Sequence, residues 1–225
     1  MYNLYVFHTN RPDLTKKAVD STKGYFNIYV IDNSKDQELS NNDNYLFNDQ
    51  EYLNNWVYTP PIPFTFLQSQ KLIHTWEKDS SDGNPFYFWM HNDGKFIDSP
   101  QKLIEYTETI HKEQEGKWGA VFTHYDVACA FNTNALTAIG GWGDYFEQYF
   151  LDNHVYRQLR LAGYPTFDTD VNVHHHVSQT IYSEPARMLR HRILWPFYER
   201  LYELGWGGKP GEETYETFFN VPKGE

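Results

Sequence analysis

The sequence predicts an α/β fold in which an open sheet is flanked by helices. Short apolar runs rich in β-branched and aromatic residues alternate with stretches of helical periodicity. Three of the apolar runs end in polar clusters, which occupy residues 9–11, 32–34 and 91–93. Because ligands of open α/β sheets bind beyond the carboxyl ends of the strands, these clusters predict a binding site along that edge.

The first predicted strand covers residues 2–8 and the second covers residues 26–32. Between them, Pro12 suits the first turn of a helix. The spacing of the two strands is typical of a βαβ unit, in which the strands are parallel. The polar stretch from Lys35 to Asn55 is predicted to be a loop.

The rest of the chain continues this alternation. The later predicted elements are a helix over 67–77, a strand over 86–90, a helix over 100–114, one or two strands within 118–133, a helix after residue 150, a strand over 166–177, and a helix with an irregular tail. One face of the helix after residue 150 is formed by Leu151, Val155, Leu159 and Ala162. Gly163 is the predicted end of that helix, because glycine readily adopts the conformation that follows a last turn.

The composition narrows the class of protein. The 225 residues are expected to form one domain. The net charge of -11 disfavours binding to nucleic acid or an anionic membrane through bulk charge, although a local basic patch is compatible with it. Cys129 is the only cysteine, so it is expected in the core and in a reducing compartment. No stretch resembles a signal peptide or a membrane span, so we expect a soluble, cytoplasmic protein without a membrane partner.

The stretch FYFWMHNDGKF, residues 86–96, ends an apolar run in His91-Asn92-Asp93. Asn, Asp and Gly alone would make an ordinary turn after a strand. The added His91 makes a second interpretation available, a cluster of ligands. A nucleoside diphosphate usually needs a divalent cation to neutralise its phosphates, and Asp93 with His91 could hold one. Imidazole beside carboxylate suits Mn²⁺ better than Mg²⁺.

The order of these motifs resembles the GT-A nucleotide-sugar glycosyltransferases, in particular the inverting family 2. Residues 91–93 resemble the Asp-x-Asp metal motif of that family, with His91 in place of the first carboxylate. Residues 32–34 resemble the element that contacts the nucleobase and ribose, and residues 9–11 resemble the first loop on the nucleotide. The resemblance implies that the nucleotide sugar is bound by Thr9, Asn10, Arg11, Asp32, Asn33 and Asn92.

A second block, AFNTNALTAIGGWGDYFEQYFLDNHVYRQLRLAGY, resembles the family's Gly-Gly turn, its acidic pair and its Arg-rich helix. Asp152 falls on the carboxylate that acts as general base in the family, whereas Leu151 and His154 replace neighbouring acids. The segment VHHHVS resembles the late strand that often gives another metal ligand. Side chains alternate along a strand, so His174 and His176 share one face, and they are the predicted ligands. The sequence does not decide whether that face or the face of His175 meets the metal.

The resemblance implies a metal-dependent hexosyl- or pentosyltransferase that moves a sugar, with inversion, from a nucleoside diphosphate, favoured as UDP, to a hydroxyl acceptor. It divides the chain into a donor half at 1–95, an acceptor half at 96–180 and a tail at 181–225. The predicted acceptor contacts are Trp142, Arg190 and Arg192. The two arginines belong to a basic, aromatic tail, which suggests a sharper version in which the acceptor is a hydroxymethylated pyrimidine in phage DNA.

Other interpretations stay open at this point. The chain could be a nucleotide- or carbohydrate-binding module without catalysis, because two acids of the family pattern are missing. A nucleotidyltransferase is disfavoured, since no Gly-rich loop with a lysine follows the first strand. Asp152 could cap a helix, the three histidines could lie on a solvated strand, and the tail could be a packed cover.

Overall fold

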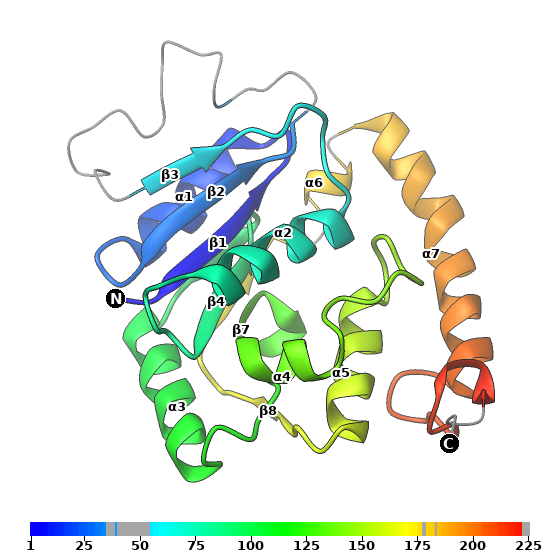
Figure 1. Ribbon diagram of the computed structural model, residues 1–225. Coiled ribbons are helices and arrows are strands. Elements are labelled where there is room, and N and C mark those ends of the chain that lie inside the picture. Colours follow the sequence, from blue (N-terminus) through cyan, green and yellow to red (C-terminus); the bar gives the residue numbers. More distant parts are fainter. Residues whose placement is uncertain (35–38, 40–54, 177–178, 183, 222–225) are drawn as a thin grey trace.

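The computed structural model describes residues 1–34, 39, 55–176, 179–182 and 184–221, which Figure 1 draws in colour. The predicted loop from Lys35 to Asn55 lies outside these described residues, apart from Leu39 and Asn55.

A mixed sheet of seven strands runs through the molecule, as the sequence predicts. Its order is β3 (Asn55–Tyr58), β2 (Asn27–Asp32), β1 (Asn3–His8), β4 (Phe86–His91), β7 (Ala128–Asn132), β6 (Ala120–Phe122) and β8 (Thr166–Asp168). The first four strands in this order are parallel, and β7 is antiparallel to both of its neighbours. β4 and β6 therefore point the same way. The sheet takes strands from both the donor half and the acceptor half.

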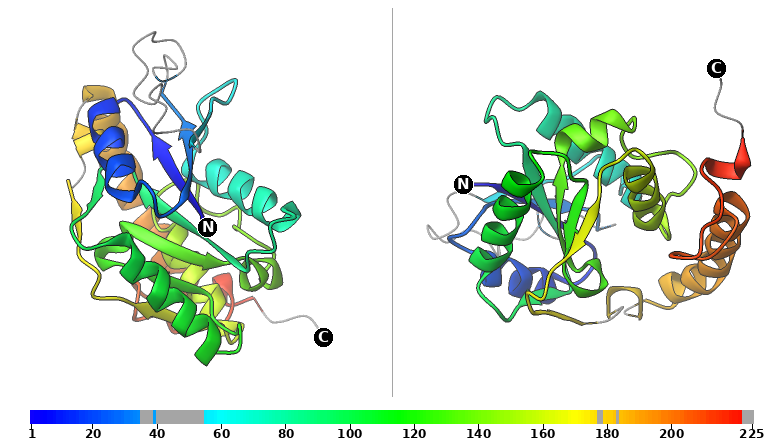
Figure 2. Two further views of the ribbon diagram at one scale, coloured as in Figure 1. Left: turned by 90° about the vertical axis from the view of Figure 1, so that its left-hand side faces the viewer. Right: turned by 90° about the horizontal axis from the view of Figure 1, so that it is seen from below.

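Helices cover both faces of the sheet (Figure 2). The helices are α1 (Pro12–Thr22), α2 (Phe66–Asp79), α3 (Pro100–Glu113), α4 (Thr133–Ala138), α5 (Leu151–Leu161), α6 (Gln179–Tyr182) and α7 (Pro185–Trp206). α1 and α3 contribute to the core on one face, whereas α2, α4 and α5 contribute to the core on the other. The inner side of α7 joins the second core. None of the helices among the described residues combines the length and apolar character that a membrane crossing needs.

The two cores follow from alternation along the buried strands. In β4, Phe86 and Phe88 belong to the core under α1 and α3, while Tyr87 and Trp89 belong to the core under α2 and α5. Successive side chains of a strand point to opposite faces, so a strand covered on both sides must be apolar throughout. This explains why the run from residue 86 is continuously apolar. Cys129 is buried in the second core, as expected.

Local sequence signals set the helix boundaries. Thr65 and Gln68 form a capping box at the start of α2, and Ser99 caps α3 by accepting a hydrogen bond from the N–H of Gln101. The apolar face predicted for α5 is confirmed for Leu151, Val155 and Leu159, which are buried. Ala162 instead is an exposed C-cap residue. Gly163, with φ of 84°, follows it in the left-handed conformation.

The strand predicted over 166–177 was wrong in one respect, because the segment forms two strands in different sheets. β8 pairs with β6 in the main sheet, whereas β9 (Val173–His175) pairs with β5 (Gly94–Phe96). Between β8 and β9, the N–H of Asn172 donates a hydrogen bond to the Asp98 carboxylate at 2.9 Å. This bond holds the segment beside β5 and separates β9 from the main sheet. This short second sheet brings the histidine segment beside the end of β4.

Candidate active site

The three predicted polar clusters meet at one edge of the sheet. β1 lies between β2 and β4 in parallel register, with His8 opposite Asp32 and Phe7 opposite His91. The strands therefore end side by side. His8, Asp32, Asn92 and Asp93 are all buried, although turn residues after a strand are normally exposed. Burying polar groups is unfavourable unless they have partners. This edge therefore differs from a set of ordinary turns and is a candidate binding site.

The loop after β1 is covered by the segment around α6. Asn10 adopts a left-handed conformation with φ of 50°, and its side-chain amide donates to the Glu184 carboxylate. Arg11 makes a two-pronged ion pair with Asp13, with both N–O distances 2.8 Å, and donates to Gln179. The predicted donor residues Thr9, Asn10 and Arg11 thus lie between β1 and α1, and Asn10 and Arg11 contact the segment around α6.

Asp32 and Asn33 shape the loop that follows β2. The Asp32 carboxylate accepts hydrogen bonds from the N–H groups of Ser34 (3.0 Å) and Leu39 (3.1 Å). The Asn33 amide donates to the Ser69 hydroxyl at 3.0 Å and accepts from the N–H of Phe64 at 3.3 Å. These bonds fix the wall of the site beside β2. Contact of these two residues with a nucleotide stays a prediction.

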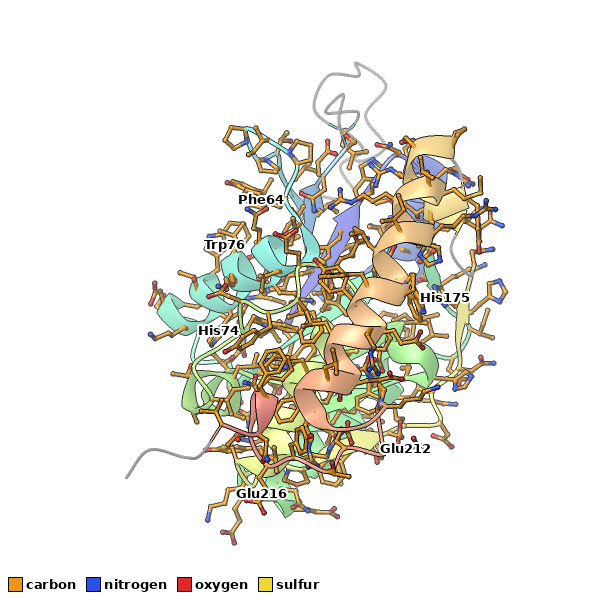
Figure 3. The ribbon with its side chains drawn as sticks, turned by 90° about the vertical axis from the view of Figure 1, so that its right-hand side faces the viewer. Phe64, His74, Trp76, His175, Glu212 and Glu216 are labelled. Atoms are coloured by element: carbon orange, nitrogen blue, oxygen red, sulfur yellow. The ribbon has the colours of Figure 1, made fainter. Side chains whose placement is uncertain are left out.

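His91, Asp93 and His175 form a cluster at the end of β4, which we call the His–Asp–His cluster. The Nε2 atom of His175 lies 3.4 Å from Oδ1 of Asp93, and the rings of His91 and His175 stack with centroids 5.6 Å apart. Figure 3 labels His175. Burial by itself raises the pKa of Asp93, but the hydrogen bond from His175 and the nearness of His91 outweigh it, so the pKa is lowered. Burial lowers the pKa of His91 to about 4.

His174 and His176, the two ligands predicted in the late strand, do not point toward Asp93 as His175 does. Gly94 is paired with His175 across the small sheet, so the side chain of His175 lies beside Asp93. The rings of His174 and His176 contact each other, with centroids 4.4 Å apart. The N–H of His176 donates to the carbonyl of Asp93 at 2.9 Å. Ligation by His174 and His176 stays a prediction, and His175 joins it as a candidate.

The donor atoms of the His–Asp–His cluster fit a divalent cation of the manganese type. A carboxylate oxygen and an imidazole nitrogen 3.4 Å apart can both reach one ion, and this mixed pair suits Mn²⁺. Across the part of the chain that is described, no group of three such side chains is close enough to enclose an ion.

A half-buried carboxyl pair, Asp126 and Asp152, lies near the start of α5. Burial and then the Asp152 charge raise the pKa of Asp126 to about 8. Burial also raises the pKa of Asp152. The N–H of Asn153 donates to Oδ1 of Asp152 at 2.9 Å and lowers this pKa, but burial outweighs it. The carboxyls are hydrogen-bonded to each other, and we assign the proton to Asp126 and the charge to Asp152. Sequence reasoning found Asp152 and missed Asp126, which sits alone in a connection without a motif.

One backbone hydrogen bond joins the two clusters. The N–H of His91 donates to the carbonyl of Val127, the residue after Asp126, at 3.0 Å. Val127 also fills the space that a side chain at Gly94 would need, since an added Cβ would lie 2.6 Å from its methyl group. The connection between β6 and β7 therefore packs directly on the turn that carries Asp93. The carboxyl pair and the His–Asp–His cluster belong to the same edge of the sheet.

The predicted acceptor residues lie elsewhere. Trp142 is buried between Phe131 and Phe66, with ring centroids 5.2 and 6.3 Å away, so it offers no free face to a sugar as the prediction required. Arg190 and Arg192 are exposed on α7. A different arginine is nearer to the strand ends. Arg187 pairs with Glu184 at 3.1 Å, and its charge helps lower the pKa of the buried His8, after burial itself and against Asp32.

This fold and edge define a class. The chain has a GT-A-type fold, as the resemblance in its sequence implies. A solved structure with this architecture is the mannosyltransferase PcManGT from Pyrobaculum calidifontis in complex with GDP-Man and Mn²⁺, with a TM-score of 0.60, 11% identity, and 85% of this chain covered. Residues 1–349 of TarS from S. aureus match with a TM-score of 0.54, 11% identity, and 91% of this chain covered.

The likeness to these proteins concerns the fold. This chain spans 61% of the mannosyltransferase and 43% of the longer TarS structure, which matches with a TM-score of 0.53. The shorter TarS structure is spanned to 72%. No family model and no curated protein matches the sequence.

Proposed function

We propose that the chain is a metal-assisted glycosyltransferase that moves a sugar from a nucleoside diphosphate to an acceptor hydroxyl. The observation that carries the proposal is the hydrogen bond from His91 to Val127, because it joins the turn that carries Asp93 to the segment that carries Asp126 in a GT-A-type fold. Such a transfer needs a positive centre at the departing diphosphate and a base at the attacking hydroxyl.

The donor diphosphate would lie between the His–Asp–His cluster and the loop after β1. Asp93 and His175 would hold the cation, for which Mn²⁺ fits better than Mg²⁺, and the cation would neutralise charge on the diphosphate. Arg187, oriented by its pair with Glu184, would provide a second positive charge at the end of β1. The mannosyltransferase neighbour holds GDP-Man, whereas the sequence favours UDP, so both bases belong in the test.

The carboxyl pair would carry the proton chemistry. As the acceptor oxygen attacks C1 of the sugar, the bond from C1 to the phosphate oxygen breaks on the opposite face, which inverts the anomeric centre. The Asp152 carboxylate takes the hydroxyl proton, and the nucleoside diphosphate leaves. Asp126 keeps its own proton and donates to Asp152, so that Asp152 is held as the ionised member of the pair.

The proposal is tested by incubating the protein with UDP- and GDP-sugars in Mn²⁺ or in EDTA, and measuring thermal shift and released nucleoside diphosphate. We expect one donor to stabilise the protein only with Mn²⁺. The Asp93→Ala variant should lose this stabilisation, while Asp152→Asn should keep it but lose transfer by about 100-fold or more. Asp79→Ala, an exposed carboxylate at the end of α2, is the matched control.

Two outcomes would contradict the proposal. Full transfer by the Asp93→Ala variant would remove the metal part. Donor binding without transfer or hydrolysis under any acceptor condition would favour the alternative of a nucleotide- or carbohydrate-binding module.

A further inference from the structure

Helix α7 packs on the molecule through only one of its faces. Tyr198, Tyr202 and Trp206 are buried against the core that contains α5, and the Trp206 indole donates to Nδ1 of His154 at 3.1 Å. These three side chains recur every four residues, which defines the inner face of the helix. In Figure 3, α7 crosses the front of the molecule, so the view is onto its opposite, outer face.

The outer face of α7 is apolar, where a solvated helix normally carries polar side chains. The exposed fractions are 60% for Leu189, 60% for Ile193, 59% for Phe197 and 52% for Leu204. The first three are spaced by four residues, and Leu204 follows one heptad after Phe197, so all four lie on one stripe. A continuous exposed stripe of this kind marks a surface that binds a partner.

Charges of both signs flank this stripe, with arginines toward its N-terminal half and Glu199 and Glu203 toward its C-terminal half. Arg190 and Arg192 are exposed beside it, and neither forms a salt bridge within the described part of the chain. Two other arginines of α7 are paired, Arg187 with Glu184 and Arg200 with Glu203, each at 3.1 Å. The whole chain has a net charge of -11, so the positive N-terminal half of the stripe is a local departure from the rest of the molecule.

We propose that the outer face of α7 lies on the surface of an anionic phospholipid bilayer. Aliphatic and aromatic side chains would enter the boundary between head groups and acyl chains, and Arg190 and Arg192 would meet the phosphates, as in interfacial amphipathic helices. This departs from the expectation of no membrane partner, but it involves no crossing. The inference stands independently of the proposed function.

The other occupants fit the stripe less well. Leu189 and Ile193 offer nothing to a phosphate backbone, and nucleic acid is bound mainly through polar and stacking contacts. A second copy of the chain would also cover the apolar stripe, and the test distinguishes that occupant by self-association. The bilayer uses both the apolar stripe and its flanking arginines.

The test is sedimentation of the full chain with vesicles of phosphatidylcholine, alone or mixed equally with phosphatidylglycerol. We expect binding to the mixed vesicles that weakens with salt. The variant Leu189→Ser/Ile193→Ser/Phe197→Ser should lose binding to the mixed vesicles. The variant Arg190→Gln/Arg192→Gln should bind them about tenfold more weakly. Ile62→Ser/Ile97→Ser changes two equally exposed apolar residues elsewhere and should bind normally.

Circular dichroism and thermal unfolding establish that each variant is folded. The proposal is overturned if the unchanged chain does not sediment with the mixed vesicles, or if the Ile62→Ser/Ile97→Ser control loses binding as much as the α7 variants do. It is equally overturned if the α7 substitutions abolish self-association or binding to duplex DNA while vesicle binding is absent.

Discussion

At the scale of single residues, three of the six non-glycine residues with positive φ in the described part of the chain lie near the candidate active site, and the others are Glu115, Phe219 and Asn220. Asn10, Asp126 and Phe150 have φ of 50°, 54° and 62°, values that residues other than glycine rarely adopt. Asn10 lies in the loop after β1. Phe150 directly precedes α5, in which Asp152 is the second residue. Each conformation costs roughly 1 kcal/mol or more and persists only where the surroundings enforce it. The surroundings of Asn10, Asp126 and Phe150 therefore hold this edge of the sheet in a defined conformation.

The carboxyl pair predicts how one substitution changes stability with pH. The folded chain holds a proton on Asp126 up to about pH 8, whereas the unfolded chain releases it near pH 4. Because the folded state binds the extra proton, the free energy of unfolding should fall by about 1.4 kcal/mol per pH unit across this window as pH rises. Asp126→Asn needs no proton, so its stability relative to the unchanged chain should grow between pH 5 and pH 7.5, as measured by urea unfolding.

Asp170→Asn, at an exposed position, provides the control for this comparison and should show no such pH dependence. A constant difference between Asp126→Asn and the unchanged chain over the same range would show that Asp126 is ionised in the folded state, contrary to our assignment of the proton.

At the scale of elements, the C-terminal segment is fixed to α7 by close packing. Phe218, in the short 3₁₀ helix η3 (Phe218–Asn220), covers Gly205 so tightly that an added Cβ would lie 2.0 Å from its ring. The same ring packs on Trp206 and on His154 of α5, with centroids 5.3 and 4.9 Å away. Gly205 is thus a contact glycine within a helix, where glycine is otherwise unfavourable.

This contact predicts a non-additive pair of substitutions. Gly205→Ala should lower the free energy of unfolding by about 1–3 kcal/mol, because the methyl group and the ring cannot occupy the same space. Phe218→Ala should be destabilising through lost burial. The double variant should be more stable than the sum of the single effects predicts, as measured by thermal or urea unfolding. Strict additivity would mean that the ring does not lie on Gly205.

At the scale of the whole molecule, buried histidines should make the fold sensitive to acid. Burial lowers the pKa of His8 and of His154 to about 4. Between the ordinary value near 6.5 and about 4, the unfolded chain binds protons that the folded chain does not, so stability is lost as pH falls. The carboxyl pair acts in the opposite direction, so a comparison of variants is needed to separate the two.

His154→Gln isolates one of these histidines. A glutamine can still accept the hydrogen bond from Trp206, but it takes up no proton. Between pH 7.5 and pH 5, the variant should retain up to about 2 kcal/mol more of its unfolding free energy than the unchanged chain does. His124→Gln, at an exposed position, is the control. Equal losses in the unchanged chain and in His154→Gln would exclude a buried neutral His154.

Sequence patterns predicted those parts of the fold that depend on long or regular stretches. β1, β2 and β4 were predictable because both of their faces are buried, which requires apolar runs. β3, β5, β9 and α4 are only three to six residues long and carry too few residues for a periodic pattern. Their formation depends on neighbours distant in the sequence, as the separation of β8 from β9 by Asp98 illustrates.

The candidate site divides in the same way. Clusters after parallel strands were predictable, because parallel strands end at a shared edge. The choice of His175 depends on its register with Gly94, and the pairing of Asp126 with Asp152 depends on a tertiary contact, so neither is visible in local sequence. Trp142 was predicted to contact the acceptor because it follows the Gly-Gly turn of the resembling block. The turn at Gly141, with φ of 81°, instead precedes a Trp142 that is buried in the core.

The pairing of β5 with β9 also sets the time at which the site can assemble. Asp93 and His175 lie about 80 residues apart, and only three residue pairs of the small sheet bring them together. During synthesis, the sheet strands β1, β2 and β4 can emerge and pair long before His175 is made. A growing chain can therefore form most of its framework before His175 reaches Asp93.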